Sequence, residues 1–427
     1  MLDVKRLRQD PDGMRAALGR RLDPSLDAAL DGILDLDRRR RDILGRVEAR
    51  KAERNAATEE VARLKRAGQD AEALMARLRE SGDDVKALDA ELRDVDAQLD
   101  HALLSIPNTP LTEVPDGDAS ANRVVRTWGE PRVFDFTPRP HWDTGAELGL
   151  FDLPRGAKIA GSGFPLFIGM GARLVRALAN FMLDLHTREH GYVEMAPPFV
   201  VNRATLTATG QLPKFEDDAY ASPADDLFLI PTAEVPVTNY YRDELLDGGA
   251  LPAAFVAYTP CFRREAGAHG KDTRGLIRVH QFDKVELVRL VRPEDSPGEH
   301  ELMTGHAERV LQLLGLPYRV LELAAGDTGF ASARTYDLEV WAPGVGAWLE
   351  VSSASTFTDF QARRANIRFR RDAKAKPELV HTLNASGLAF PRTIIAILEN
   401  CQEADGSVRV PEALVPYLGT DRLAPRA

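Results

Sequence analysis

The densest group of side chains suited to chemistry lies between residues 259 and 286. Arg263 and Glu265 end one short apolar run, and Phe282 and Glu286 lie on the next run, after a polar loop. A guanidinium can clamp a phosphate through two parallel hydrogen bonds, and an aromatic ring can stack on a nucleobase. If the two runs pair as a hairpin, strand alternation brings these side chains onto one face of a sheet. Surface ion pairs on a hairpin are the competing interpretation.

Other types of catalytic centre find little support in the sequence. The histidines, His269 and His280 among them, lack the spacing of metal ligands, so we expect no zinc site. Cys261 precedes Arg263 in an apolar run and is interpreted as a packing residue rather than a nucleophile. The chain has only two cysteines, Cys261 and Cys401, so we expect neither a disulfide framework nor a cysteine zinc site.

The elements that would carry these residues follow from the pattern of apolar positions. Helices are predicted over residues 171–190 and 297–314, and residues 111–160, rich in Pro, Gly and Asp, are interpreted as an irregular connection. A strand is expected after Gly191, and further strands are expected over residues 227–230, 254–259, 284–290, 318–323, 336–341 and 347–351. Because strands and helices do not alternate regularly, we predict an antiparallel α+β sheet rather than a doubly wound one.

Residues 26–106 have a different character, with no proline and no aromatic residue. Apolar residues from Leu74 to Ile106 recur in alternating steps of four and three, with one polar break at Ser81, which is typical of a coiled coil. The preceding half is less regular, because arginines such as Arg40 occupy positions on the expected seam.

A break at residues 67–70 divides this stretch into two helices, which we predict to fold back as an antiparallel coiled-coil hairpin. Pro107 ends the second helix, because proline cannot continue it. Such a hairpin serves either as a dimerisation or spacer element or as the reader of a large partner. Its first helix carries arginines interleaved with acids, a pattern that fits a solvated face as well as a phosphate-binding one. These arginines include Arg38, Arg41, Arg46, Arg50 and Arg54.

Composition bounds the class of protein. The chain of 427 residues is 44% hydrophobic, which supports a large core and argues against disorder along the whole chain. Its length suggests two or three domains. No apolar run approaches the roughly 18 residues of a membrane span, and the charged first residues do not form a signal peptide, so we expect a soluble protein of the reducing cytoplasm. The net charge of -10 argues against nucleic acid as a partner of the whole surface, although a local basic site can still bind one.

Several motifs together resemble those of class II aminoacyl-tRNA synthetases. Phe262-Arg263-x-Glu265 together with Phe282 resembles motif 2. Gly191-Tyr192 with Pro198 resembles motif 1, which that class uses for dimerisation. Gly387-Leu-Ala with Arg392 resembles motif 3, whose arginine contacts ATP. Five segments are similar to bacterial seryl-tRNA synthetases: Pro231-Thr-Ala-Glu234, Thr259-Pro-Cys-Phe-Arg263, Thr273-Arg-Gly-Leu-Ile-Arg278, His280-Gln-Phe-Asp-Lys-Val-Glu286 and Thr335-Tyr-Asp-Leu-Glu-Val-Trp341. The resemblance covers nearly the whole chain, including the hairpin.

The resemblance implies two domains and a set of site residues. Residues 1–110 would form a tRNA-binding domain whose arm spans about residues 26–106, and residues 111–427 a catalytic domain. The five arginines of the arm would contact tRNA. The residues expected to bind ATP are Arg263, Arg264, Glu265, Arg278, Val279, Phe282, Glu350, Val351, Ser352, Ser353 and Arg392. Those expected to bind serine are Thr232, Ala233, Glu234, Arg263, Glu286 and Ser386.

Three of these residues, Arg263, Glu350 and Arg392, would be catalytic, and Glu350 and Ser353 would hold Mg²⁺ through ATP. Two departures from the family pattern affect the backbone near Arg392: Ala385 replaces a glycine, and Phe390-Pro391 replaces smaller residues.

The implied activity is that of a homodimeric ligase, which joins L-serine to tRNA(Ser) through seryl-adenylate and uses ATP and Mg²⁺. Whether tRNA(Sec) is also a substrate stays open. No protein nucleophile is needed, because positioning and neutralisation of phosphate charge do the work. One alternative is a synthetase-like ligase that loads an amino acid onto a carrier protein, but such proteins lack the long hairpin. Another is an inactive paralogue with a binding role, against which the joint presence of Arg263, Glu286, Glu350, Ser386 and Arg392 argues.

Overall fold

The computed structural model describes residues 1–266 and 274–425. Two expectations from the sequence therefore lie outside the described residues, namely Thr273 as the start of a family motif and His269 as a histidine without a metal. The chain divides into two compact units. The hairpin unit comprises residues 2–19 and 23–107, and the larger unit comprises residue 1, residues 20–22 and residues 108–427.

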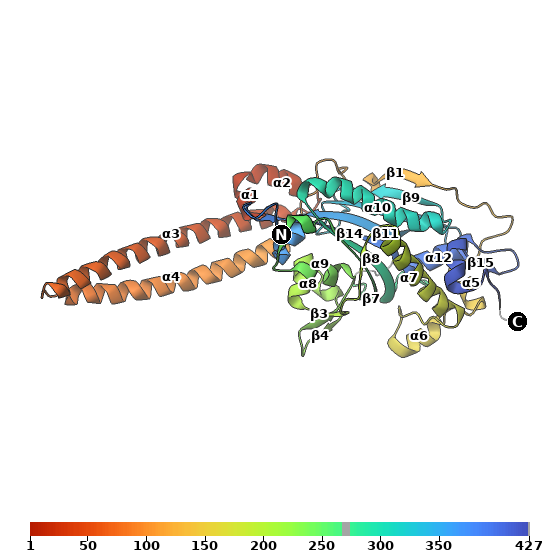
Figure 1. The fold of residues 1–427 in the computed structure, drawn as a ribbon, viewed down its shortest axis with the longest axis horizontal. Coiled ribbons are helices and arrows are strands. Elements are labelled where there is room, and N and C mark those ends of the chain that lie inside the picture. Colours follow the sequence, from red (N-terminus) through yellow and green to blue (C-terminus); the bar gives the residue numbers. More distant parts are fainter. Residues whose placement is uncertain (267–273, 426–427) are drawn as a thin grey trace. The chain divides into compact units, whose positions relative to one another are not determined.

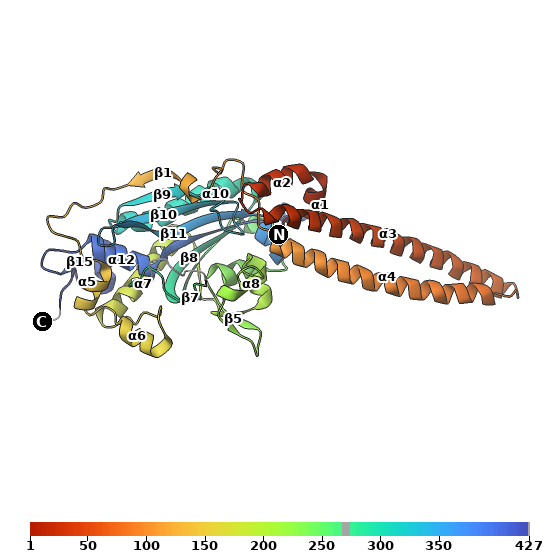
Figure 2. The ribbon, with the colours of Figure 1, turned by 180° about the vertical axis from the view of Figure 1, so that it is seen from behind.

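The hairpin unit consists of two short and two long helices. They are α1 (Val4–Gln9), α2 (Pro11–Gly19), α3 (Ser25–Arg66) and α4 (Glu72–Ser105). The long helices run side by side in both views (Figure 1 and Figure 2), which confirms the predicted antiparallel hairpin. The turn between them contains Gly68 at a φ of 69°, a left-handed conformation that suits glycine.

The two helices of this hairpin are joined by apolar contacts and by charge pairs. Ile43 and Val47 of α3 pack with Leu88 and Val95 of α4. Arg40, which departs from the apolar pattern, donates a hydrogen bond from Nε to Oδ1 of Asp96 at 2.6 Å. The irregular half of the seam is therefore bridged by a charge pair across the two helices.

The larger unit is built on an eight-stranded sheet in the order β1-β9-β10-β11-β14-β8-β7-β2. Its strands are β1 (Arg123–Trp128), β2 (Val193–Met195), β7 (Ala253–Phe262), β8 (Gln281–Val291), β9 (Tyr318–Glu322), β10 (Arg334–Ala342), β11 (Ala347–Thr358) and β14 (His381–Ala389). Neighbouring strands are antiparallel except β2 and β7, which are parallel. The predicted α+β class with an antiparallel sheet is thereby confirmed.

Smaller sheets and nine further helices complete this unit within the described residues. The short strands are β3 (Val200–Asn202), β4 (Ala221–Ser222), β5 (Leu227–Leu229), β6 (Leu245–Asp247), β12 (Arg368–Arg370), β13 (Glu378–Leu379), β15 (Val408–Arg409) and β16 (Arg422–Leu423). The helices are α5 (His141–Glu147), α6 (Leu153–Ala160), α7 (Met170–Arg188), α8 (Arg203–Thr209), α9 (Glu234–Thr238), α10 (Ser296–Leu313), α11 (Phe360–Ala365), α12 (Phe390–Asn400) and α13 (Val415–Leu418). In the described part of the chain, no helix is both long and apolar enough to cross a membrane.

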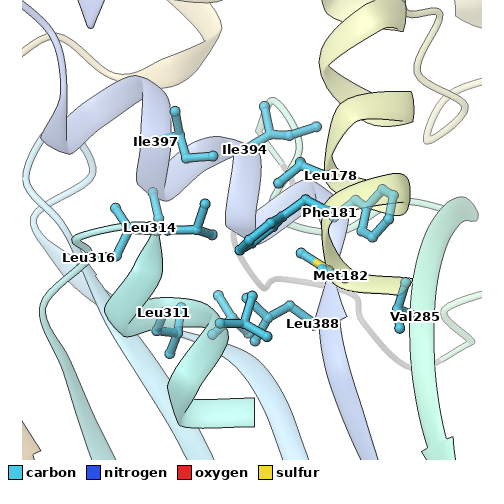
Figure 3. Packing of buried hydrophobic residues seen from close by; sticks show 14 of the residues in the cluster. Leu178, Phe181, Met182, Val285, Leu311, Leu314, Leu316, Leu388, Ile394 and Ile397 are labelled. Atoms are coloured by element: carbon cyan, nitrogen blue, oxygen red, sulfur yellow. The ribbon is translucent and has the colours of Figure 1, made fainter. Parts of the chain in front are cut away.

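The main core lies between the large sheet and helices α7, α10 and α12. Figure 3 shows Met182 of α7, Leu311 of α10, Ile394 of α12 and Val285 of β8 among the residues that surround this core. On β8 the alternate residue Lys284 lines a cavity instead. Because successive strand residues point to opposite faces, the same strands supply both the core and a polar site.

Two parts of the sequence were predicted incorrectly. Residues 111–160, expected to be irregular, contain β1, α5 and α6. Their Asp and Pro residues act as helix starts, as where Asp152 accepts a hydrogen bond from the backbone N–H of Arg155 at the beginning of α6. The central strand β14 was not predicted, because its many small and polar residues lack a strong β pattern.

Gly171, in the first turn of α7, offers a test of this packing. A Cβ at Gly171 would lie 1.8 Å from the carbonyl oxygen of Leu150. Helical Gly→Ala substitutions ordinarily stabilise a protein by up to about 1 kcal/mol. Gly171→Ala should instead cost about 1–3 kcal/mol, because the helix must shift.

The matched control is Gly305→Ala in α10, where an added Cβ meets nothing within 4 Å. Thermal unfolding followed by circular dichroism should show a lower midpoint for Gly171→Ala and an unchanged or higher midpoint for Gly305→Ala. Equal midpoints in the two variants would contradict the described approach of α7 to Leu150.

Candidate active site

A cavity of about 430 Å³ lies in the larger unit over the polar face of β8, β11 and β14. It brings together most of the residues singled out in the sequence. These are Thr232, Glu234, Arg263, Glu265, Arg278, Val279, Phe282, Glu350, Val351, Ser353, Ser386 and Arg392. The remaining predicted residues, which do not line it, are Ala233, Arg264, Ser352 and Glu286.

Each of these exceptions has a visible structural place. Ala233 and Glu286 are buried behind the cavity wall. Ser352 donates a hydrogen bond from Oγ to the carbonyl oxygen of Ser386 at 2.6 Å and so links β11 to β14. Arg264 points elsewhere, with its guanidinium carbon 6.0 Å from the ring centre of Tyr220.

One end of the cavity is cationic and aromatic. The guanidinium carbon of Arg263 lies 5.2 Å from the ring centre of Phe282, and its Nε donates to the carbonyl oxygen of Pro231 at 3.3 Å. Arg263 follows β7 and Phe282 is the second residue of β8, in the register that pairs Cys261 with Phe282. The predicted convergence of these two side chains on one face is therefore present in the structure.

Two further arginines at this end are held by carboxylates. Arg278 donates from Nη1 to Oε2 of Glu265 at 3.1 Å. Arg392 donates from Nη1 to the carbonyl oxygen of Glu350 at 2.8 Å and to its Oε2 at 3.4 Å, and from Nε to the carbonyl oxygen of Ile277 at 3.3 Å. Neighbouring carboxylates orient these guanidinium groups while leaving some of their N–H donors for a ligand.

An oxygen-rich group adjoins Arg392. Ser353 of β11 pairs in register with Asp337 of β10, and Glu350 lies on the same strand as Ser353. Burial and the nearby charge of Glu350 raise the pKa of Asp337 well above its usual range. Oδ1 of Asp337 is buried without a hydrogen-bond partner among the described residues. Asp337 was not predicted as a site residue, although it lies within the segment that begins at Thr335.

The other end of the cavity is a buried carboxylate network. Glu286 accepts a hydrogen bond at Oε1 from Nδ2 of Asn384 at 2.7 Å, and its Oε2 is ion-paired with Nζ of Lys284. Nζ of Lys284 also donates to Oγ1 of Thr232 at 2.8 Å. Because Glu286, Lys284 and Thr232 are all buried, this ion pair is shielded from solvent.

Glu234 continues the network. Its Oε2 accepts from the same Nδ2 of Asn384 at 3.1 Å, and its Oε1 accepts from Nε2 of Gln361 at 2.6 Å. Oε1 of Gln361 accepts in turn from Oγ1 of Thr382 at 2.7 Å. The backbone N–H of Glu234 donates to Oγ1 of Thr232 at 3.2 Å, which closes a circuit of polar groups.

Burial dominates the electrostatics of this network. It raises the pKa of Glu234 to about 7, and the charge of Glu286 adds to the rise. Burial also raises the pKa of Glu286, against the opposing charge of Lys284. When all three side chains are ionised, two carboxylates face the single ammonium of Lys284, and the charge of Arg263 acts on them more weakly than that of Lys284, so a cationic ligand would be favoured at this end of the cavity.

Sequence reasoning missed four members of the network, namely Lys284, Asn384, Gln361 and Thr382. Lys284 lies two residues before Glu286 and Asn384 two residues before Ser386, so strand alternation applied to the known members indicates both. Gln361 has no such signal, because its place depends on how α11 packs against β14.

The arginines of the hairpin unit are mostly paired with acids of the same unit. Arg38, Arg41, Arg46 and Arg50 lie at the surface and form ion pairs with Asp35, Asp37, Asp42 and Glu53 respectively. Arg54 is half-buried. Asp37 is buried, but the other three pairs are exposed and contribute little to stability, so the guanidinium groups of Arg38, Arg46 and Arg50 can exchange a carboxylate for a phosphate at small cost.

Both departures from the family pattern are accommodated by packing. Ala385 is buried, between Ala354 and Leu287 in register, and its methyl group joins the main core. Phe390 is buried and stacks on Tyr258 with ring centres 5.7 Å apart, and Pro391 in the first turn of α12 lines the cavity.

Comparison with known proteins yields two family matches and full-length relatives. Residues 1–110 match the seryl-tRNA synthetase N-terminal domain, and residues 214–401 match the class II tRNA synthetase core domain (G, H, P, S and T). The chain is 59% identical over 425 residues to the serine–tRNA ligase of Gemmatimonas aurantiaca, covering 99% of this chain and 100% of that protein.

Solved structures agree with this likeness. The crystal structure of seryl-tRNA synthetase from Pyrococcus horikoshii complexed with ATP has a TM-score of 0.95 and 38% identity, with all of both chains covered. That of the cytoplasmic serine–tRNA ligase from Naegleria fowleri in complex with AMP has a TM-score of 0.89 and 28% identity, covering 100% of this chain and 99% of the other.

Proposed function

Because the chain belongs to the seryl-tRNA synthetase family, we propose that its cavity is the site at which serine is activated and transferred to tRNA. The chain is a serine–tRNA ligase that uses ATP. In the first step the serine carboxylate attacks the α-phosphate of ATP, which gives seryl-adenylate and diphosphate. In the second step a terminal ribose hydroxyl of tRNA(Ser) attacks the acyl carbon and AMP leaves.

The observation that carries the assignment of roles is the polarity of the cavity from one end to the other. A guanidinium and aromatic end suits a nucleotide, and a buried end with excess carboxylate suits an ammonium. Arg263 lines the same cavity as both groups. The α-phosphate and the serine carboxylate, which must meet for the first step, would therefore both be anions within reach of one guanidinium.

At the nucleotide end, we assign stacking on adenine to Phe282 and contacts with the outer phosphates to Arg278 and Arg392. Glu265 and Glu350 hold these two arginines by the hydrogen bonds described above, so the donors are oriented before ATP binds. Such preorganised donors stabilise the charge that develops on the phosphate oxygens in the transition state.

At the buried end, we assign the serine ammonium to the carboxylates of Glu234 and Glu286. One added positive charge offsets their excess over Lys284. The serine hydroxyl would bond to polar groups of the same circuit, with Thr232 and Ser386 at the cavity wall. Alanine would leave those groups unpaired, which is the condition under which a site rejects an analogue strongly.

Mg²⁺ fits the oxygen donors beside Arg392. Glu350 and Ser353 would hold it together with the phosphates of ATP, since Mg²⁺ is usually bound by one or two carboxylates plus substrate phosphates. The unpartnered Oδ1 of Asp337 adds a carboxylate oxygen to this group. When bound, Mg²⁺ neutralises phosphate charge. The described residues contain no cluster of three or more His, Cys, Asp and Glu that could hold a metal ion alone.

We further propose that the protein is a cytoplasmic homodimer that binds tRNA through its hairpin unit. Around β2 and β3, Val193, Phe199 and Val200 are exposed to 60%, 44% and 45%, and an apolar surface of this kind suits the homodimer that motif 1 implies. We place the protein in the cytoplasm, where its thiols stay reduced. The hairpin unit would bind tRNA(Ser) through its arginines. tRNA(Sec) is the second tRNA that the proposal covers, and charging of a tRNA(Sec) transcript tests this directly.

Arg263→Ala tests the assignment at the nucleotide end. Removing one preorganised donor should lower serine-dependent pyrophosphate exchange about a hundredfold or more, equivalent to about 3–4 kcal/mol. Arg263→Lys keeps the charge but loses the forked geometry, so its activity should lie between wild type and alanine. As a control, Arg371→Ala removes a surface arginine paired with Glu294 and Glu378 and should leave exchange unchanged. Near-normal exchange in Arg263→Ala would remove this residue from the active site.

Replacement of residues 28–104 by a short turn tests the role of the hairpin and separates a tRNA ligase from a carrier-protein ligase. The shortened protein should still form seryl-adenylate but should fail to charge tRNA(Ser) at ordinary concentrations. In the full-length protein, affinity for tRNA should fall steeply with salt, because arginine–phosphate contacts release counterions. Equal charging by both proteins would show that the hairpin is only a spacer.

A further inference from the structure

Arg21 is a buried arginine that the predicted site does not include. Its guanidinium donates four hydrogen bonds, all of them to backbone carbonyl oxygens of the larger unit. The acceptors and distances are Asn108 at 3.0 Å, Thr328 at 2.6 Å, Gly329 at 2.9 Å and Ser332 at 2.5 Å. Burial without a carboxylate among these acceptors lowers the pKa of Arg21 to about 10. A buried charge is costly unless it is hydrogen-bonded. The loss of any of these bonds would therefore leave a buried donor without an acceptor, which holds the guanidinium of Arg21 in this position.

Asn108 reinforces the same segment from the other side. Its Nδ2 donates to the carbonyl oxygens of Ala331 at 3.0 Å and Phe357 at 2.9 Å, and its backbone N–H donates to the carbonyl oxygen of Phe330 at 2.9 Å. Together, Arg21 and Asn108 bind the carbonyl groups of every residue from 328 to 332. We call this pair the clasp.

The held segment is a wall of the active-site cavity. Residues 329–332 line it, as do Thr209 and Gly210 at the end of α8, and Gly210 lies next to Phe330 and Ala331. The ring of Phe330 lies edge-on to Phe360 of α11, with ring centres 6.0 Å apart. The next residue, Gln361, donates to Oε1 of Glu234 and to the carbonyl oxygen of Thr209. A continuous set of contacts thus runs from the clasp to a carboxylate of the serine end.

The clasp also has a particular place along the chain. Arg21 and Asn108 lie in the parts of the larger unit that immediately precede and follow the main segment of the hairpin unit, residues 23–107. The two points at which the chain leaves and re-enters the larger unit are therefore both fastened to one wall of the cavity.

We propose that Arg21 and Asn108 are positioning residues for the serine end of the active site, which act through the wall at residues 328–332 and through Gln361. The chain at both ends of the hairpin is thereby coupled to serine binding. This inference rests on the proposed function, because it names serine as the ligand of the buried end. The kinetics of variants at Arg21 and Asn108 measure this coupling directly.

Arg21→Met and Asn108→Asp are the informative variants, since each keeps the approximate size of the side chain and removes its side-chain donors to the wall. In pyrophosphate exchange without tRNA, the serine KM should rise by roughly tenfold or more in both variants, because a displaced wall misplaces Glu234. The ATP KM should stay within about twofold of wild type, since the hydrogen bonds that orient Arg263, Arg278 and Arg392 go to residues outside the wall. Arg21→Lys, which keeps the charge and some donors, should recover part of the loss.

Arg20→Met is a matched control. Arg20 also donates to backbone carbonyls, those of Leu111 and Val114, but it does not contact residues 328–332. This variant should leave both KM values within about twofold of wild type. If Arg21→Met folds poorly, amide hydrogen exchange in Asn108→Asp provides a second measurement, with protection expected to fall at residues 328–332.

The outcomes separate two kinds of failure. If wild-type protein shows no serine-dependent exchange, the proposed function is wrong and the inference falls with it. If wild type is active but Arg21→Met and Asn108→Asp keep the normal serine KM, or raise the serine and ATP KM values equally, the clasp does not position the serine end. Equal effects of Arg20→Met and Arg21→Met would also overturn the proposal.

Discussion

Two carboxylates buried together, Glu234 and Glu286, are the constraint on which the rest of the active site depends. Removing an ionised carboxylate from water costs several kcal/mol unless opposite charge and hydrogen bonds compensate for it. Lys284 and Asn384 compensate in part, and the pKa of Glu234 still rises to about 7. The proposed serine complex supplies the missing positive charge. The positive charge that binds serine to the pocket is therefore also the charge that stabilises the two buried carboxylates.

The sheet makes this burial possible. Strand alternation on β8 directs Lys284 and Glu286 to the polar face while Val285 enters the main core. On β14 the pairing register with β8 shifts at Gly387, between Ser386, which lines the cavity, and Leu388, which packs in the main core. Only glycine fits there without adjustment, because a Cβ would lie 2.9 Å from Nε2 of the buried His186. The core and the site therefore constrain each other through single residues.

The sequence predicted what depends on local spacing and missed what depends on long-range contact. The hairpin of α3 and α4 follows from a repeat, and the approach of Phe282 to Arg263 follows from strand pairing and family motifs. Gln361 belongs to no such pattern, because it reaches Glu234 only after α11 has packed on the sheet. Arg21 is separated by about three hundred residues from its carbonyl acceptors near Ser332, so no local rule indicates their contact.

Isothermal titration calorimetry of serine binding tests the central claim most directly, because it measures the protons that accompany binding. Near pH 7 the carboxyl of Glu234 is about half protonated, and an arriving ammonium favours the ionised form and lowers its pKa. Titrations in buffers of different ionisation enthalpy should therefore reveal release of up to about half a proton at pH 7 and much less at pH 8.5. Serine binding without proton release at pH 7, or with proton uptake, would contradict the assignment of the serine ammonium to this pair of carboxylates.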